Sequence, residues 1–279
     1  WNNYVKIKIT GKWWFQCTIY HTRYLQVIII FIMNRRIEVK KLMIVLLMIS
    51  LLFSFSLTTY AETEDLNKKP LITGEINLSE KEEQEYLDSM SKDDFLKIQE
   101  KEQEEKLLNS QITTKAVTKI SIPGTFTMYQ QINNYYCAPA SVKSVLQYIN
   151  GSSASQSTIA NGLGTTSDGT SPTKIAPYLN QKQSFYYARF ANPSQTDMCD
   201  KLYATITGPK KPCLMSIVNI SGSNWHYSTG GHRLVINAIY SDKSKIQFAD
   251  PLGGKQSGWP YYYLKTKAVA SSVCRDIIW

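Results

Sequence analysis

The sequence predicts an α+β fold, in which helices come first and an antiparallel sheet follows. From residue 115 onward the composition is that of a compact domain of about 165 residues, which is enough for one sizeable core. Apolar residues recur at helical spacing early in this domain and in short strand-like runs later, mostly after residue 213. Helices followed by a group of strands are typical of α+β proteins.

The clearest predicted helix spans residues 138–150. Pro139 suits its first turn, and Gly151 follows as a C-terminal cap. Its apolar face consists of Val142, Val145, Leu146 and Ile149. Three further helices are expected: one capped by Ser157 and ending near Gly162, one from Ser171 and Pro172 to about Leu179, and one over 195–206 with Ser194 and Asp197 at its start.

The strands are expected in the second half of the domain. A short turn at Asp242 and Lys243 joins the last two into a hairpin. Residues 260–279 fit a strand and a helix equally well. The predicted strands are 184–190, 213–220, 232–240 and 244–249.

The residues before the domain have the pattern of a targeting segment. Basic residues follow Met33, an apolar run covers 42–57, and small residues end the stretch at Ala61. The run of about 16 residues is shorter than the ~20 that a membrane span needs, so residues 33–61 are predicted to be a secretory signal peptide. Residues 1–32 are expected to be a non-native N-terminal extension, which removes Cys17 and His21 from the chemistry.

Residues 62–114 form a strongly acidic region between the signal peptide and the domain. They carry 15 acids and seven lysines, a net charge of −8, while residues 115–279 carry 16 Lys or Arg and six Asp, a net charge of +10. Ser79 with Glu82 and Ser91 with Asp94 indicate two capped helices. The region is predicted to be a charged helical linker, or a pro-segment that lies across the oppositely charged domain.

Cys137 is the candidate nucleophile. It stands at the start of the predicted helix, where unpaired N–H groups and the helix dipole would lower its pKa and favour a thiolate. The alternative is an inert buried cysteine, since Cys is among the most buried residue types. Secretion also permits disulfides, and the pairing of Cys137, Cys199, Cys213 and Cys274 stays open.

A nucleophilic cysteine needs a base and a group that orients it. His232 follows two glycines at the start of an apolar strand, whereas His226 lies in a polar loop. Asp250 ends the next strand, and the beginning of one strand lies beside the end of its antiparallel neighbour. A structural histidine and an Asp-Pro turn are the respective alternatives. Gln131, six residues before Cys137, is the candidate donor to an oxyanion.

Two stretches, "QINNYYCAPASVKSVLQYI" and "GGHRLVINAIYSDKSKIQFADP", resemble the double-glycine-leader (bacteriocin-processing) peptidases, in their secreted, transporter-free form. The resemblance covers roughly 120–255. It implies a papain-like cysteine peptidase fold, with the nucleophile helix packed on the sheet. It also implies Cys137 as nucleophile, His232 as base, Asp250 as orienting acid and Gln131 as oxyanion donor. Ala138 departs from the glycine often found there and is expected to narrow the cleft.

The predicted function is therefore that of a secreted bacterial cysteine peptidase that acts through a thioester on peptide or protein substrates. A peptidoglycan stem-peptide hydrolase or acyltransferase with the same triad, and an exported non-catalytic binding module, remain as alternatives. No cofactor is expected, and the cysteine and histidine spacings match no zinc site. The basic domain suits anionic cell-wall polymers better than nucleic acid, because its lysines are scattered and export removes that partner.

Overall fold

The computed structural model describes residues 4–9, 13–18, 74–111, 116–220 and 225–279. The chain divides into two units, residues 1–68 and 69–279. In the first unit, β1 (Tyr4–Ile9) and β2 (Trp13–Thr18) form an antiparallel pair in the region expected to be a non-native extension. The predicted signal peptide, 33–61, lies outside the described residues. No helix among the described residues is long and apolar enough to cross a membrane.

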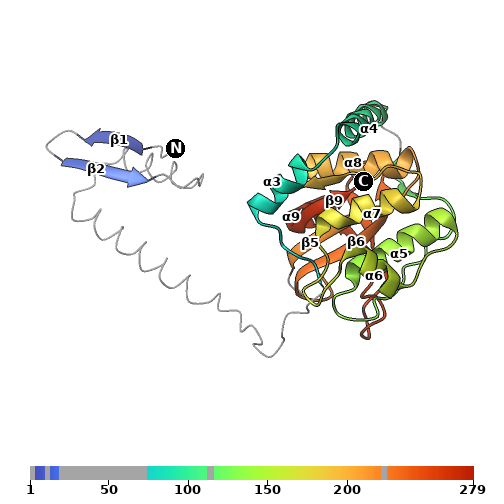
Figure 1. Ribbon diagram of the computed structural model, residues 1–279. Helices are drawn as coiled ribbons and strands as arrows, with labels where there is room; N and C mark the ends of the chain where they lie inside the picture. Colours follow the sequence, from blue (N-terminus) through green and yellow to red (C-terminus); the bar gives the residue numbers. More distant parts are fainter. Residues whose placement is uncertain (1–3, 10–12, 19–73, 112–115, 221–224) are drawn as a thin grey trace. The chain divides into compact units, whose positions relative to one another are not determined.

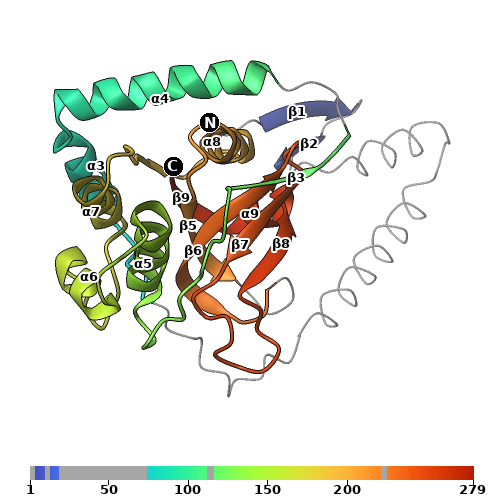
Figure 2. The ribbon, with the colours of Figure 1, turned by 90° about the vertical axis from the view of Figure 1, so that its right-hand side faces the viewer.

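The second unit has the predicted α+β organisation, in which most helices precede most strands of a seven-stranded antiparallel sheet (Figures 1 and 2). Its helices are α3 (Glu80–Asp88), α4 (Lys92–Ser110), α5 (Cys137–Asn150), α6 (Gln156–Leu163), η1 (Pro172–Lys174), α7 (Ile175–Lys182), α8 (Gln195–Thr207) and α9 (Lys267–Val273). Its strands are β3 (Lys119–Ser121), β4 (Arg189–Ala191), β5 (Cys213–Ile220), β6 (Thr229–Tyr240), β7 (Lys245–Ala249), β8 (Tyr262–Thr266) and β9 (Cys274–Ile278). Their order in the sheet is β4-β9-β5-β6-β7-β8, with β3 beside β6.

Most of the predicted elements are confirmed, and the differences have local causes. The helix after α5 is capped by Ser155 instead of Ser157, because the Ser155 hydroxyl accepts from the Thr158 N–H at 3.1 Å. The predicted strand 184–190 shrinks to β4. The Tyr187 N–H donates to the Asn180 side-chain oxygen at 2.7 Å, and the Tyr187 carbonyl accepts from the Asn180 side-chain nitrogen at 2.8 Å. Both backbone groups of Tyr187 are therefore already hydrogen-bonded, so this residue does not pair with a neighbouring strand.

The ambiguous C-terminal stretch contains both predicted structures. It forms β8, then α9 capped by the Thr266 hydroxyl, then β9, which pairs with β4 and β5. β9 therefore inserts into the sheet next to β5, which no local pattern indicates. The last residue, Trp279, is 2% exposed and part of the core.

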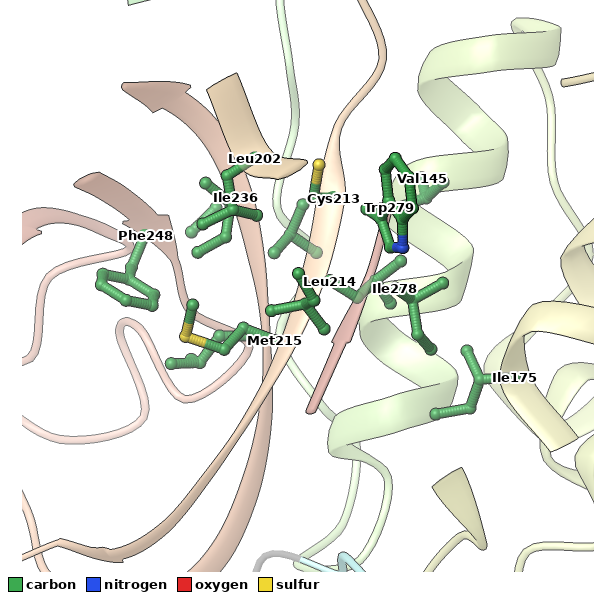
Figure 3. Close-up of a cluster of buried hydrophobic side chains, with 14 of the residues drawn as sticks. Val145, Ile175, Leu202, Cys213, Leu214, Met215, Ile236, Phe248, Ile278 and Trp279 are labelled. Atoms are coloured by element: carbon green, nitrogen blue, oxygen red, sulfur yellow. The ribbon is translucent and has the colours of Figure 1, made fainter. Parts of the chain in front are cut away.

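The core lies on both faces of the central strands. Nearly every residue of β5 and β6 is buried, although successive side chains point to opposite faces. In Figure 3, Val145 of α5 and Ile175 of α7 lie on one side of β5, and Leu202 of α8 and Phe248 of β7 lie on the other. The strand β6 is thus buried within the sheet, and α5 packs against it.

Both predicted capping boxes are present at the starts of α3 and α4. Neither helix contains a buried residue, so they form no core of their own. They pack instead on the domain, and α4 crosses over α8 (Figures 1 and 2). The described part of the acidic region thus contacts the domain through α3 and α4.

Candidate active site

Cys137 is the first residue of α5, and its side chain is fully buried. The N-cap residue, Tyr136, makes no side-chain capping hydrogen bond. The N–H groups of the first turn therefore keep their capacity to stabilise negative charge beside the thiol.

The strand β6 extends beyond the end of its neighbour β7, and α5 meets this free edge. The pairing with β7 begins at Val235, whereas the pairing with β5 continues back to Thr229. At Arg233 the backbone N–H interacts with the Cys137 thiol, and the carbonyl accepts from the Ser141 hydroxyl at 3.1 Å. The first turn of α5 thus takes the place of the missing strand partner and brings Cys137 next to the residue that follows His232.

His232 and Asp250 lie together, as the hairpin argument predicted. The His232 Nε2 is 2.9 Å from the Asp250 Oδ1, and both side chains are almost completely buried. An ionised carboxylate only accepts hydrogen bonds, so Nε2 carries the proton. The other ring nitrogen, Nδ1, is buried and has no hydrogen-bond partner among the described residues. Neutral His232 can therefore accept a proton at Nδ1.

Asp250 is held by more groups than the histidine alone. The Tyr227 and Tyr263 hydroxyls donate to its Oδ2 at 2.6 and 2.7 Å, and the Leu252 N–H donates to its Oδ1 at 2.8 Å. Burial opposes ionisation, but His232 and these donors outweigh it and lower the pKa of Asp250. The Tyr227 ring also packs edge-on against the His232 ring, with centroids 5.5 Å apart.

Gln131 is fixed close to this pair, although its side chain is turned to a local partner. Its N–H donates to the Pro251 carbonyl at 2.9 Å, which places the residue beside Asp250. Its side-chain Nε2 donates to the Asn133 carbonyl at 2.7 Å. The Gln156 side chain supports the same loop by bonding Gln130 and Ile132. An oxyanion role for Gln131 requires its second N–H, or a change of partner.

A short part of the acidic region covers the site, and we call residues 74–77 the covering segment. Gly74 accepts from the Thr170 N–H at 2.8 Å, and Ile76 donates to the Thr170 carbonyl at 3.2 Å. Gly74 has φ +80°, and a Cβ there would come within 2.3 Å of the Tyr135 Cα, two residues before the nucleophile. A Cβ on Gly231, the residue before His232, would lie 3.0 Å from the Cβ of Glu75. The segment thus passes between the two halves of the site.

The Glu75 carboxylate forms a buried ion pair with the guanidinium of Arg233. On its other side Arg233 binds Asp276, with Nη1 2.5 Å from Oδ1. Burial opposes the charge, but Asp276 and Glu75 outweigh it and raise the pKa of Arg233. All three side chains are completely buried.

The thiol of Cys137 does not have the lowered pKa that its helix position predicted. Burial raises the pKa of Cys137 well above its usual value, and the negative charge of Glu75 raises it further. The N–H groups of Arg233 and Ala138 act in the opposite direction but do not prevail. The covering segment therefore contributes to the raised pKa of Cys137, because Glu75 belongs to that segment.

The expectation about Ala138 also changes with the structure. Its methyl group was expected to narrow the cleft, but it is fully buried within the hydrophobic core cluster. Thr170 pairs with Glu75 of the covering segment. His226 packs on the Tyr263 ring, with centroids 4.9 Å apart.

All four cysteines of the described domain are free thiols. Cys137, Cys199 and Cys213 are buried, and Cys274 is partly buried. Across residues 74–111, 116–220 and 225–279, no group of three or more His, Cys, Asp or Glu is arranged to hold a metal ion.

Sequence reasoning missed Glu75, Arg233 and the two tyrosines that hold Asp250. Arg233 directly follows His232, so its position signals that it lies at the site, but a charged residue within an apolar strand gives no sign of its partner. Glu75 is 158 residues away from Arg233 in the chain, and no spacing rule connects them.

The chain is similar to a known protein family and to several solved structures. A model of the Peptidase_C39 like family matches residues 124–271, just over half of the chain. A comparison with curated proteins found no match. One similar solved structure is the peptidase domain of Streptococcus ComA, a bifunctional ABC transporter involved in quorum sensing. It is 18% identical in sequence, the match covers 56% of this chain and 97% of that chain, and the TM-score is 0.40.

Two further solved structures show the same level of similarity. Xylellain, a cysteine protease from Xylella fastidiosa, is 11% identical, with 62% of this chain and 88% of that chain covered and a TM-score of 0.47. A double-glycine motif protease from an AMS/PCAT transporter, in complex with the leader peptide, is 12% identical, with 58% and 96% covered and a TM-score of 0.37.

Proposed function

Because the chain belongs to the Peptidase_C39 like family and is a cysteine peptidase, we propose that it hydrolyses peptide bonds with Cys137 as nucleophile, His232 as base and Asp250 as the orienting acid. The observation that carries this assignment is the His232–Asp250 pair, which leaves only Nδ1 of the buried imidazole unpaired among the described groups. The family assignment also replaces the earlier alternative of a non-catalytic binding module.

In the proposed reaction, Nδ1 of His232 removes the thiol proton, and the Cys137 sulfur attacks the carbonyl carbon of the scissile bond. Negative charge develops on the carbonyl oxygen, where the uncapped first turn of α5 and the Gln131 amide act as donors. The protonated imidazole then gives its proton to the leaving amine as the carbon–nitrogen bond breaks. Water, deprotonated by the same imidazole, attacks the thioester and releases the acid and the thiol.

Asp250 keeps the imidazole in the required form throughout. Its hydrogen bond holds the proton on Nε2, so the basic lone pair is on Nδ1. Its lowered pKa keeps it ionised, and its charge stabilises the imidazolium formed during the reaction. Tyr227 and Tyr263 position the carboxylate without taking part in proton transfer.

We further propose that the acidic region, residues 62–114, is a pro-segment and that the described state is a latent enzyme. Cys137 and His232 are both 0% exposed, and the covering segment lies against residues on either side of them. A substrate carbonyl has no path to the thiol while Gly74 and Glu75 stay in position.

The contacts that α3 and α4 make with the rest of the domain support the proposal that these helices can be removed from it. These contacts include several polar and charged bonds: Glu83 binds Arg189 at 2.6 Å, Glu105 binds Lys201 at 3.0 Å, and the Tyr186 hydroxyl donates to Asp94 at 2.8 Å. A cavity of about 420 Å³ separates part of these helices from α7. Such an interface is less tightly packed than the domain core.

The signal peptide pattern supports secretion, so latency would protect the cell that makes the enzyme. The chemistry is shared by peptidoglycan stem-peptide hydrolysis and by acyl transfer, and incubation with purified cell walls separates these substrates from ordinary peptides. The net positive domain favours anionic cell-wall polymers as a partner.

The triad is tested by digestion of a peptide library with the full chain, alongside Cys137→Ala and His232→Ala. Both substitutions are expected to abolish cleavage, and undiminished cleavage by Cys137→Ala would refute the assignment.

Latency is tested with Gly74→Ala, which should expel the segment because its Cβ collides with Tyr135. Gly124→Ala is the matched control, since it has the same left-handed backbone, φ +72°, but its Cβ meets nothing within 4 Å. Gly74→Ala should raise both peptide cleavage and the rate of Cys137 alkylation by iodoacetamide at least tenfold, with Gly124→Ala unchanged. Equal alkylation rates in the two variants would contradict latency.

A further inference from the structure

Three arginines converge beside the active site, and most of their negatively charged partners belong to the covering segment and α3, which together we call the covering layer. Arg233 binds Glu75 and Asp276, Arg189 binds Glu83 and Asp276, and Arg275 lies 3.5 Å from Glu75. Of these carboxylates, only Asp276 belongs to residues 115–279. We call Arg189, Arg233 and Arg275 the arginine cluster.

Departure of the layer would leave the arginine cluster with a single carboxylate. Three guanidinium groups beside Asp276 amount to two unbalanced positive charges. Arg233 would keep Asp276, but its Nε and Nη2 groups would lose the hydrogen bonds that they now donate to Glu75. The vacated position of Glu75 therefore favours the binding of another anion.

That position is close enough to the reacting groups to contact a bound substrate. Glu75 affects the Cys137 thiol electrostatically and packs on Gly231, next to His232. Its backbone pairs with Thr170 in an isolated parallel β-bridge, in the way that a peptide substrate pairs with the edge of a binding site. The present occupant is thus a glutamate whose backbone is paired with the domain, beside the nucleophile.

Resting on the proposed function, we propose that Arg233 and Arg275 form a specificity subsite for an acidic side chain of the substrate, which Glu75 fills in the latent enzyme. The planar guanidinium of Arg233 offers two donors to one carboxylate, through Nε and Nη2. Arg275 borders the same carboxylate and also holds the Ile76 carbonyl at 2.6 Å. A glutamine of the same shape would lose the charge-assisted bonds.

The test measures occupancy through protection of the Cys137 thiol, so it needs no catalysis. The full-length Gly74→Ala chain is alkylated with iodoacetamide in the presence of the peptide Thr-Gly-Glu-Ile-Asn-Leu or its Gln counterpart, and modified Cys137 is counted by mass spectrometry. The Glu peptide should protect at a concentration at least tenfold lower than the Gln peptide, consistent with the strength of hydrogen bonds to charged groups.

Two variants made in the Gly74→Ala chain locate the effect. Arg275→Gln should reduce the Glu advantage at least threefold. Lys255→Gln should leave it unchanged, because Lys255 is a nearby cation that bonds Asn134 and lies outside the arginine cluster. Equal protection by the two peptides, or no protection by either, overturns the subsite.

Glu75→Gln is a second variant intended to displace the covering segment, and it is used in case the segment stays in place in the Gly74→Ala chain. If the thiol remains shielded in both variants, the segment is not replaceable and the subsite is refuted. Failure of the peptidase assignment gives a different result, namely selective protection by the Glu peptide with no peptide cleaved.

Discussion

The carboxylate of Glu75 is paired with the guanidinium of Arg233 at a point where neither side chain is exposed. The backbone of the same Arg233 holds Cys137 and Ser141 at the start of α5. One residue therefore organises the nucleophile through its main chain and the covering segment through its side chain. Changes in the covering segment should be detectable at the thiol.

Glu75→Gln should destabilise the covering segment by about 3–5 kcal/mol, the usual cost of removing one partner from a buried ion pair. Hydrogen exchange should speed up at the N–H groups of Ile76 and Thr170, which bond across the segment. Glu80→Gln is the control, because that side chain is exposed in the first turn of α3. Unchanged exchange in Glu75→Gln would show that the pair contributes little.

Asp250→Asn should lower kcat/KM by about 10²–10⁴, because an amide no longer fixes the proton on Nε2 or stabilises the imidazolium. Tyr263→Phe removes only one hydrogen bond to the carboxylate and should lower kcat/KM far less. Both are measured in the Gly74→Ala chain, with circular dichroism to verify folding. Equal losses in the two variants would mean that Asp250 acts by packing alone.

Lys101→Met should stabilise the protein by about 1–3 kcal/mol at pH 7. Lys101 lies over the rings of Phe185 and Trp279, and burial lowers its pKa to about 8. The unfolded chain keeps a pKa of about 10.4, so the charged form is penalised only by folding. The gain should therefore shrink as pH rises from about 8 and disappear above about 10.4.

Urea denaturation at pH 7 and pH 10.5 measures this effect. Lys97→Met makes the same substitution on an exposed face of the same helix and should change stability by less than about 0.5 kcal/mol at either pH. A Lys101→Met gain that does not depend on pH would indicate better packing instead of relief of a buried charge.

Ala138→Gly should cost about 1–2 kcal/mol of stability, from helix propensity and lost burial of one methyl group. It should leave KM unchanged, because that methyl lies in the core cluster. A lowered KM for bulky peptides would restore the earlier expectation that Ala138 narrows the cleft. Thermal denaturation and peptide kinetics measure the two effects separately.

Most of the helices and strands could be predicted from the sequence, because the strongest sequence patterns are local. Apolar spacing and Gly151 bounded α5, and the hairpin turn at Lys243, with φ +58°, aligned β6 with β7. The same alignment brought His232 and Asp250 together. The strand β4 was overestimated, because the side chain of Asn180 competes for the backbone of Tyr187.

The remaining features depend on long-range packing that no periodicity records. The insertion of β9 beside β5 and the pairing of Glu75 with Arg233 join segments far apart in the chain. Burial and, to a smaller extent, the negative charge of Glu75 raise the pKa of Cys137, so local reasoning about a helix N-terminus gave the wrong sign. Charge complementarity indicated contact of the acidic region, but gave no indication of which glutamate enters the site.

The separation of 158 residues between Glu75 and Arg233 also sets an order of events during synthesis. A ribosome adds about 5–20 residues per second, so Glu75 emerges roughly 8–30 seconds before Arg233. The covering segment already exists when His232, Arg233 and Asp250 are made. Under the proposed latency, the enzyme would therefore have no interval during synthesis in which its cleft is complete and the covering segment is missing.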